Sequence, residues 1–443
     1  FVLHAAGRAG RGHDGHQRIL RSARSARRPS PQPHALERYQ CMTTPNTTAC
    51  AIWCTGPILI AVQSARLFND SKDFVDSPLL VPPDECWQRW RALPQPPPAA
   101  ALADFVNTTF GPPGGGLEPW DPPDFTPSPP LLAQLPAGPL REWASALNNL
   151  WPQLGRRCTE AVLRSPERST LLPVRRPFIV PGGRFREAYY WDSYWVVLGL
   201  LAVDMDATAR GLVSNLLECV ARHGFVPNGL RKYYLNRSQP PLLTQMVAAL
   251  LARLDAPPEG EREGAEREGA EREGAAPALR LLREALPALD AEYGWWMRTG
   301  DGRTAVRLEA DGARAEALLN RYAVAASAPR PESWREDKAT AAGLPPAAQA
   351  RAWSELAACA ESGWDFSSRF MGGELGGELG GEGGGEGRGK AEEEPLRSLR
   401  TAAVLPVELN AILCRGDAEG RPPRRHPSER RAPPCRLRNE LTL

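Results

Sequence analysis

The chain has 443 residues, 42% of them hydrophobic, so it can bury a large core as one large domain or about three smaller ones. Its formal net charge of only +2 argues against a nucleic-acid partner or an acidic polymer. The longest apolar stretch, Ala51 to Val62, is interrupted by Gly56 and Pro57 and is too short for a transmembrane helix.

The N-terminal segment, residues 1–50, is rich in Arg, His and Ser and has no continuous apolar run. We expect a disordered basic leader; an organelle transit peptide is the alternative, and no secretory signal is visible. The nine cysteines form no paired C-x-x-C spacing, so no metal site is predicted, and their odd number leaves at least one thiol free. Sequons for N-glycosylation, typical of a secreted or cell-surface protein, stand at Asn46, Asn69, Asn107 and Asn236, although Asn236 lies inside a candidate site and is not expected to carry a glycan.

Proline-rich stretches come next in the chain, at Pro82–Pro98 and Pro112–Pro139. Proline removes a backbone donor and disfavours helix interiors, so both stretches predict irregular or extended backbone. Beyond them, apolar residues at helical spacing predict a helix through Leu212–Val220 that ends at Gly224.

Further helices follow towards the C-terminus. Pro240 and Pro241 suit the first turn of a helix that continues through Leu250, and helical patterns recur at Leu279–Trp296 and Pro346–Cys359. Strand-like alternation is scarce. Helices that alternate with blocks containing Gly, Pro and Asn predict an all-α architecture whose loops carry the chemistry.

Low-complexity segments divide this helical order. The unit EREGA occurs three times within residues 259–275, and residues 372–394 are almost entirely Gly and Glu. Both are too polar to be buried, so we expect solvated insertions without function; a charged interaction tract is the alternative. The folded domain is then expected at residues 51–414, followed by a disordered Pro/Arg-rich tail at residues 415–443.

The run Pro181–Tyr194 combines glycines, arginines, carboxylates and five aromatic rings in fourteen residues. The Pro-Gly-Gly start allows a tight turn, after which charged and aromatic side chains follow closely. Aromatic faces suit the apolar face of a sugar ring, and charged groups suit its hydroxyls. The run therefore suits a carbohydrate site, although an aromatic helix start is the more frequent interpretation of such a segment taken alone.

The run resembles the first signature of the trehalases, the inverting glycosidases of α,α-trehalose. Six further blocks resemble this family in order and approximate spacing: Ala51–Leu80, Val226–Pro241, Leu318–Tyr322, Pro329–Trp334, Ser362–Phe370 and Leu405–Leu413. The resemblance implies an (α/α)6 barrel and hydrolysis of trehalose to two glucose molecules by inversion, with two adjacent glucose subsites. It implies no metal or organic cofactor, and an extracellular or cell-surface location with a lipid anchor in some members.

The resemblance also implies roles for individual residues. It places the catalytic general acid at Asp365. The positions that match sugar-binding positions of the family are Arg184, Trp191, Asp192, Asn228, Arg237, Ser238, Gln239, Arg330, Pro331, Glu332 and Gly363. Guanidinium forks suit adjacent sugar hydroxyls and stay charged near neutral pH.

Three arginines near Asp365 create an electrostatic problem, because they favour loss of the proton that a general acid must keep. Compensation is expected from desolvation or from neighbouring carboxylates. Trp364 and Phe366 are expected to form an apolar wall. The carboxylates of Asp192, Glu187 and Glu332 are expected to neutralise the arginines.

The sequence departs from the family after Cys414, where the second family signature is not found. No residue is therefore assigned as the catalytic base. We expect a C-terminally truncated chain, inactive or poorly folded in isolation, because an (α/α)6 barrel closes by packing its last helices against its first. The alternatives are a non-catalytic trehalose-binding pseudoenzyme and, from another class, a helical interaction protein that uses its charged insertions.

Overall fold

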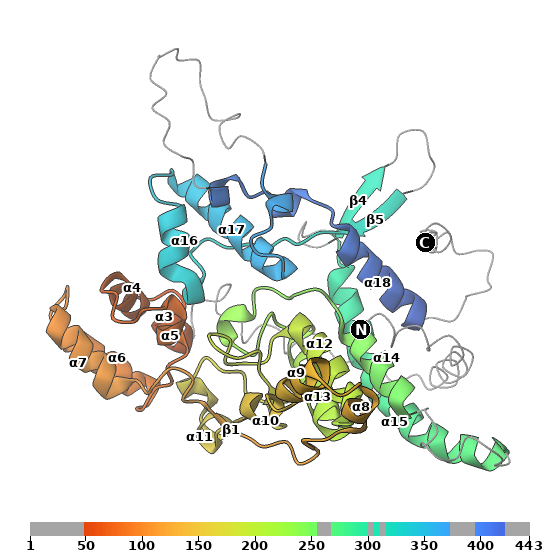
Figure 1. Ribbon diagram of the computed structural model, residues 1–443. Helices are drawn as coiled ribbons and strands as arrows, with labels where there is room; N and C mark the ends of the chain where they lie inside the picture. Colours follow the sequence, from red (N-terminus) through yellow and green to blue (C-terminus); the bar gives the residue numbers. More distant parts are fainter. Residues whose placement is uncertain (1–47, 255–266, 300–304, 310–315, 373–394, 421–443) are drawn as a thin grey trace.

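Helices make up most of the chain in a computed structural model that describes residues 48–254, 267–299, 305–309, 316–372 and 395–420 (Figure 1). Two small antiparallel sheets are the only multi-residue strand pairings in these ranges. The predicted all-α class is confirmed, and it is the class to which an (α/α)6 barrel belongs.

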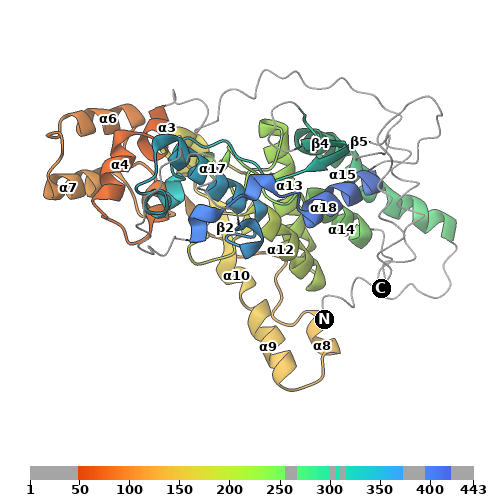
Figure 2. The same ribbon diagram turned by 90° about the horizontal axis from the view of Figure 1, so that it is seen from above.

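The N-terminal helices gather at one side of the molecule, the orange-red part of Figures 1 and 2. They are α3 (Thr48–Trp53), α4 (Pro57–Ser64), α5 (Ser71–Val75), α6 (Pro83–Arg91) and α7 (Ala99–Thr109). Their core contains Trp53, Phe74, Trp90 and Phe105, and it extends to Tyr234 of the later chain. This cluster thus ties the N-terminal helices to a loop that carries candidate site residues.

Short elements connect this part to the central helices. They are β1 (Leu117–Pro119), α8 (Pro130–Gln134), α9 (Pro139–Asn148), α10 (Trp151–Leu154), β2 (Gly155–Cys158), α11 (Glu160–Arg164), η3 (Pro166–Arg168) and β3 (Phe178–Ile179). The strands form one sheet in the order β1-β2-β3, with Leu117 opposite Cys158 and Gly155 opposite Ile179. Figure 2 shows α8 and α9 projecting from the rest of the molecule.

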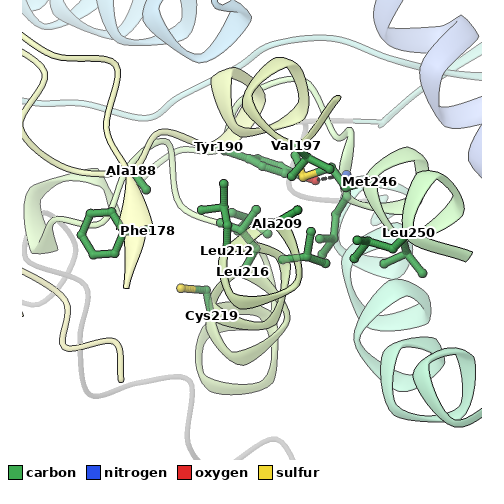
Figure 3. Packing of buried hydrophobic residues seen from close by; sticks show 14 of the residues in the cluster. Phe178, Ala188, Tyr190, Val197, Ala209, Leu212, Leu216, Cys219, Met246 and Leu250 are labelled. Carbon is green, nitrogen blue, oxygen red and sulfur yellow. Dashed lines mark hydrogen bonds between the residues drawn. The ribbon is translucent and has the colours of Figure 1, made fainter. Parts of the chain in front are cut away.

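Four long helices form the largest core: α12 (Tyr190–Ala202), α13 (Asp206–His223), α14 (Leu243–Leu254) and α15 (Arg267–Trp296). The short helix η4 (Lys232–Tyr234) lies in the connection between α13 and α14. Figure 3 shows Tyr190 of α12 next to Val197 and Met246, above Leu212 and Leu216 of α13. The first residue of α12 is therefore held in the core, which fixes the site residues that follow it.

The C-terminal elements follow the central helices. They are β4 (Ala305–Glu309), β5 (Glu316–Asn320), η5 (Pro331–Ser333), α16 (Trp334–Thr340), α17 (Pro346–Ser362), η6 (Ser368–Phe370), η7 (Pro395–Ser398), η8 (Thr401–Ala403) and α18 (Val407–Gly420). The two strands pair antiparallel, with Ala305 opposite Asn320. A third core, containing Trp296, Tyr322, Leu356 and Leu409, joins α15, α17 and α18.

The predicted helices are found with small shifts of their ends. The helix through Leu212–Val220 is confirmed within α13, and Gly224 ends it in the left-handed conformation at φ 81°. The helices at Leu279–Trp296 and Pro346–Cys359 are confirmed within α15 and α17. Helix α14 begins only at Leu243, after both prolines. Pro241 disfavours helical backbone at the residue before it, Pro240, so Pro240 does not belong to the helix.

Two expectations about irregular backbone were wrong in part. The first proline-rich stretch contains α6, because Pro83 occupies the start of that helix, where no backbone donor is needed. The second contains α8 and the start of α9 for the same reason, with prolines at Pro130 and Pro139. Proline here marks helix starts instead of excluding helices.

The low-complexity segments and the terminal segments are described only in part. Residues 255–266 and 373–394 lie outside the described residues, as do residues 1–47 and 421–443. The part of the EREGA repeat from Arg267 onwards belongs to α15. Its Glu, Arg and Ala residues have good helix propensity, so they extend the predicted helix towards the N-terminus. Helix α18 continues to Gly420, past the predicted boundary at residue 414.

Within the described ranges, no helix combines the length and the hydropathy that crossing a membrane requires.

Candidate functional site

A tight glycine turn presents the first candidate arginine. Gly182 and Gly183 have φ of 99° and 59°, and the backbone amide and carbonyl groups of Gly182 and Phe185 are hydrogen-bonded to each other at 3.2 and 3.0 Å. Both glycines occupy conformations that other residues rarely adopt, as the Pro-Gly-Gly start predicted. The turn places Arg184 between α5 and η5, where its Nη2 donates to the backbone oxygen of Glu332 at 2.7 Å.

Glu332 joins two of the three candidate arginines. Its carbonyl oxygen accepts from Arg184, and its Oε1 accepts from Nη2 of Arg237 at 2.6 Å. Glu332 is 3% exposed and Arg237 2% exposed, so this ion pair is screened little by solvent. The Oε2 atom of Glu332 is buried and has no hydrogen-bond partner among the described residues. An unpartnered carboxylate oxygen at this point is suited to accept from a ligand hydroxyl.

The third arginine, Arg330, lies two residues before Glu332 at the start of η5. Its guanidinium is 5.5 Å from the ring centroid of Phe366. Burial opposes its charge, but Asp337, Glu332 and Asp365 together raise the pKa of Arg330 above its usual value. Asp365 is therefore close enough to act on this guanidinium, and all three arginines lie around one carboxylate, Glu332.

Asp365 itself is exposed and follows helix α17 by three residues. Burial, and to a smaller extent the Asp365 carboxylate, raises the pKa of Asp192 in the first turn of α12. The charge of Asp365, in the loop after α17, thus reaches Asp192 of α12. An exposed carboxyl group beside the buried Arg330 is accessible to a ligand.

Aromatic side chains form the apolar part of the site. The rings of Trp191 and Trp364 lie 6.0 Å apart, and Trp364 is 42% exposed. Gly363 ends α17 in the left-handed conformation, at φ 70°. A Cβ at this position would lie 2.6 Å from Cε2 of Trp191, so only glycine fits against that ring. Trp364 thus has Trp191 as its aromatic neighbour, whereas the ring of Phe366 lies against the guanidinium of Arg330. The expected wall of Trp364 and Phe366 stays a prediction.

The loop between α13 and α14 supplies the remaining predicted residues. Nε of Arg237 donates to Oδ1 of Asn228 at 2.8 Å, and the backbone amide of Asn228 donates to the carbonyl oxygen of Arg237 at 3.0 Å. Oε1 of Gln239 accepts from the backbone amide of Trp191 at 3.1 Å. These bonds hold the loop against the start of α12.

Two predicted residues make structural contacts only. The hydroxyl group of Ser238 is fully buried and donates to the backbone oxygen of Val226 at 2.7 Å. Pro331 is buried at the first position of η5. The described structure thus brings together Arg184, Arg237, Arg330, Asp192, Asp365 and the two tryptophans, whereas the side chains of Ser238 and Pro331 serve the loops.

The expected role of Glu187 is corrected by its contacts. It pairs with Lys72 at 2.8 Å and with Arg231 at 3.0 Å, away from the three site arginines. The carboxylates that pair with Arg184 and Arg330 are Asp70, at 2.6 Å, and Asp337, also at 2.6 Å. Sequence reasoning missed both. Asp70 is 114 residues from Arg184, and Asp337, seven residues from Arg330, could not be told from the nearer Glu332 by sequence alone.

The sequons differ in accessibility. Asn69 and Asn107 are exposed, whereas Asn236 is 7% exposed, so a glycan does not fit at Asn236, as expected. Asn46 lies outside the described residues.

Glu292 of α15 is a buried acid, and we expect its protonation to make the stability of the chain depend on pH. Burial raises the pKa of Glu292 from 4.5 to about 7, although hydrogen bonds from Tyr190 and the Val226 amide oppose the rise. Between pH 4.5 and about 7, the Glu292 carboxyl thus keeps its proton in the folded chain but releases it in the unfolded chain. The contribution of protonated Glu292 to the free energy of unfolding is therefore complete below about pH 4.5 and is lost as pH rises through about 7. The shift corresponds to roughly 3 kcal/mol.

We expect Glu292→Gln to remove this loss, because a glutamine keeps an oxygen that can accept both hydrogen bonds but does not titrate. Urea unfolding of the variant at pH 5 and pH 8 should show a smaller difference than that of the unchanged chain. Glu284→Gln, an exposed position on α15, is the matched control and should behave like the unchanged chain. An equal pH dependence in all three proteins would contradict the prediction.

The chain is similar to known proteins over most of its length. The family model described as Trehalase matches residues 66–419. The trehalase of Homo sapiens is 39% identical over 370 residues, which cover 83% of this chain and 56% of the human protein. The trehalase of Apis mellifera is 36% identical over 376 residues, covering 84% of this chain and 53% of that protein. The periplasmic trehalase of Pseudomonas aeruginosa is 36% identical over 360 residues, covering 80% and 54%.

The chain spans about half the length of these curated relatives. The family match covers every predicted site residue, from Arg184 to Asp365. By this match and these identities, the chain belongs to the trehalase family.

Proposed function

We propose that the chain binds α,α-trehalose and takes part in its hydrolysis to two glucose molecules, with Asp365 as the general acid. The observation that carries the proposal is the convergence of Arg184, Arg237 and Arg330 around Glu332, whose Oε2 is buried without a partner. A disaccharide hydroxyl would supply the missing donor. The guanidinium groups supply donors for neighbouring hydroxyls, and Trp191 and Trp364 supply apolar faces.

The proposed step begins with the proton of Asp365, which passes to the glycosidic oxygen. The bond from that oxygen to one anomeric carbon breaks, and its electron pair stays on the oxygen of the leaving glucose. Water attacks the same carbon from the opposite face, so one glucose is released as the β anomer and the other keeps the α configuration. The base that activates this water is not assigned to a residue of this sequence.

The remaining sugar-binding assignments are part of the same proposal. Arg184, Arg237 and Arg330 would bind hydroxyls; Asp192 and Glu332 would accept from them. Asn228, Ser238, Gln239 and Pro331 would act by holding the loops, and Gly363 by leaving room for Trp191.

The test is a calorimetric titration of the full chain with trehalose, together with proton NMR of any glucose released. We expect saturable binding of one trehalose, and equal initial amounts of α- and β-glucose if the chain turns over. Binding without glucose would identify a trehalose-binding protein without activity. Absence of binding would contradict the proposal, and release of α-glucose alone would contradict inversion.

For location, we propose an extracellular or cell-surface glycoprotein. The support is the exposure of two sequon asparagines, Asn69 and Asn107. The Pseudomonas aeruginosa relative carries the word periplasmic in its name, which agrees with a place outside the cytoplasm for some members. A lipid anchor stays a prediction from the family resemblance.

A further inference from the structure

Each of the three site arginines has a carboxylate partner of its own. Glu332 pairs with Arg237 and belongs to the sugar-binding positions, whereas Asp70 pairs with Arg184 and Asp337 pairs with Arg330. The two aspartates come from α16 and from the residue before α5.

Asp337 holds both the side chain and the backbone of Arg330. Its Oδ1 accepts from Nη2 of Arg330 at 2.6 Å, and its Oδ2 accepts from Nε and from the backbone amide, both at 2.9 Å. Asp337 is 1% exposed, and its own backbone oxygen accepts from Nε1 of Trp353 at 3.1 Å. These bonds use Nε and Nη2 of Arg330 and leave its Nη1 without a hydrogen-bond partner in the described ranges. This nitrogen therefore stays available as a donor to a ligand.

Asp70 has the same role for Arg184 in a more solvated position. Its Oδ2 accepts from Nε of Arg184 at 2.6 Å, while its Oδ1 accepts from the backbone amide of Lys72 and caps α5. This cap fixes the Asp70 carboxylate at the start of α5. The orientation of the Arg184 guanidinium is therefore set by Asp70 and by the carbonyl oxygen of Glu332. The two side chains are 34% and 35% exposed, so the contribution of this pair should be the smaller one.

Asp337 also changes the charge around Asp365, through its pairing with Arg330. The charged groups that face Arg330 are Asp337 of α16, Glu332 of η5 and Asp365. Asp192 of α12 faces Asp365, and Arg237 pairs with Glu332. Without Asp337, Arg330 would stand as a buried cation beside a general acid that must keep its proton.

We propose that Asp337 and Asp70 are positioning residues of the sugar site: they orient the guanidinium groups of Arg330 and Arg184, and Asp337 also offsets the positive charge of Arg330 beside Asp365. The inference rests on the proposed function for its effect on sugar, but the orientation of the arginines is a property of the sugar-free chain. The two parts can therefore be measured separately.

The main variant is Asp337→Asn, which keeps the shape but replaces one acceptor oxygen by a donor that faces the arginine. In the sugar-free chain, we expect the Nε–H proton of Arg330 to exchange with water faster, as followed by nitrogen-15 NMR. With sugar, we expect kcat/KM to fall about 100-fold, the scale for a misplaced binding group. The alkaline limb of the pH profile should move to lower pH, because removing a negative charge favours proton loss from the general acid.

Two variants separate positioning from a general loss of structure. Asp337→Glu keeps the charge and should recover the position of the alkaline limb. Asp206→Asn removes a carboxylate from the surface pair with Arg253, whose ion pairs within the described ranges do not involve the sugar-site residues, and should leave exchange, affinity and pH profile unchanged. If Asp337→Asn does not fold, Asp70→Asn gives the same readouts at Arg184, with an expected loss of about tenfold in trehalose affinity.

The outcomes distinguish this inference from the proposed function. Unchanged exchange at Arg330 with an unchanged pH limb in Asp337→Asn would overturn the positioning role. No trehalose binding by the unchanged chain would instead overturn the proposed function, and the NMR exchange measurement would still decide whether Asp337 holds Arg330.

Discussion

In a chain that turns over trehalose, replacing Asp365 by Asn is expected to lower glucose release by about 10²–10⁴-fold, the usual contribution of a general acid. Asparagine has nearly the same shape as aspartate, but it cannot transfer a proton to the glycosidic oxygen. Trehalose affinity should stay close to that of the unchanged chain, because the buried arginines and Glu332 keep their contacts. The measurements are initial rates of glucose release and a calorimetric titration on the same samples.

Asp290→Asn is the matched control, since Asp290 is an exposed aspartate on α15. It should change neither rate nor affinity. Glucose release by Asp365→Asn at the rate of the unchanged chain would remove Asp365 from the acid role. A loss of affinity as large as the loss of rate would make Asp365 a binding residue.

The local features of the site could be predicted because short sequence patterns determine them. Gly182 and Gly183 form the expected turn, and Gly363 occupies a left-handed helix end against Trp191, where a side chain would collide. Gly224 ends α13 for the same backbone reason. Each of these depends on neighbours in the chain, so one sequence is enough.

The long-range pairings of charged groups could not be predicted in the same way. Glu187 lies within the first signature, three residues after Arg184, yet its partners are Lys72 and Arg231. Asp337 of α16, seven residues after Arg330, pairs with it, although Glu332 lies nearer to Arg330 in the sequence. A carboxylate near an arginine in sequence has many candidate partners in space, and only the fold selects one.

The buried charges behind the site are expected to have the largest effect on stability. Lys72 contacts Asp76 at 2.5 Å and Glu187 at 2.8 Å, and Arg231 contacts Glu187 at 3.0 Å and Asp76 at 3.4 Å. All four side chains are at most 1% exposed. Lys72 and Arg231 therefore share two carboxylates. If one carboxylate is lost, little water can reach the two cations to take its place.

This cluster also touches the sugar site through aromatic hydroxyls. Tyr189 donates to Oε1 of Glu187, and its hydroxyl lies 2.8 Å from that of Tyr234. The guanidinium of Arg237 is 4.8 Å from the ring centroid of Tyr234. A change at Glu187 should thus reach Arg237 as well as the overall stability.

Glu187→Gln is expected to lower the free energy of unfolding by about 3–5 kcal/mol, because it leaves Lys72 and Arg231 with Asp76 as their one carboxylate among these four groups. Urea unfolding followed by circular dichroism measures the change. The control is Glu118→Gln, which breaks a surface pair with Arg157 whose side chains are 42% and 55% exposed, and which should cost less than about 1 kcal/mol. Equal effects of the two substitutions would contradict this prediction. They would show that Lys72 and Arg231 do not need the negative charge of Glu187 for the chain to stay folded.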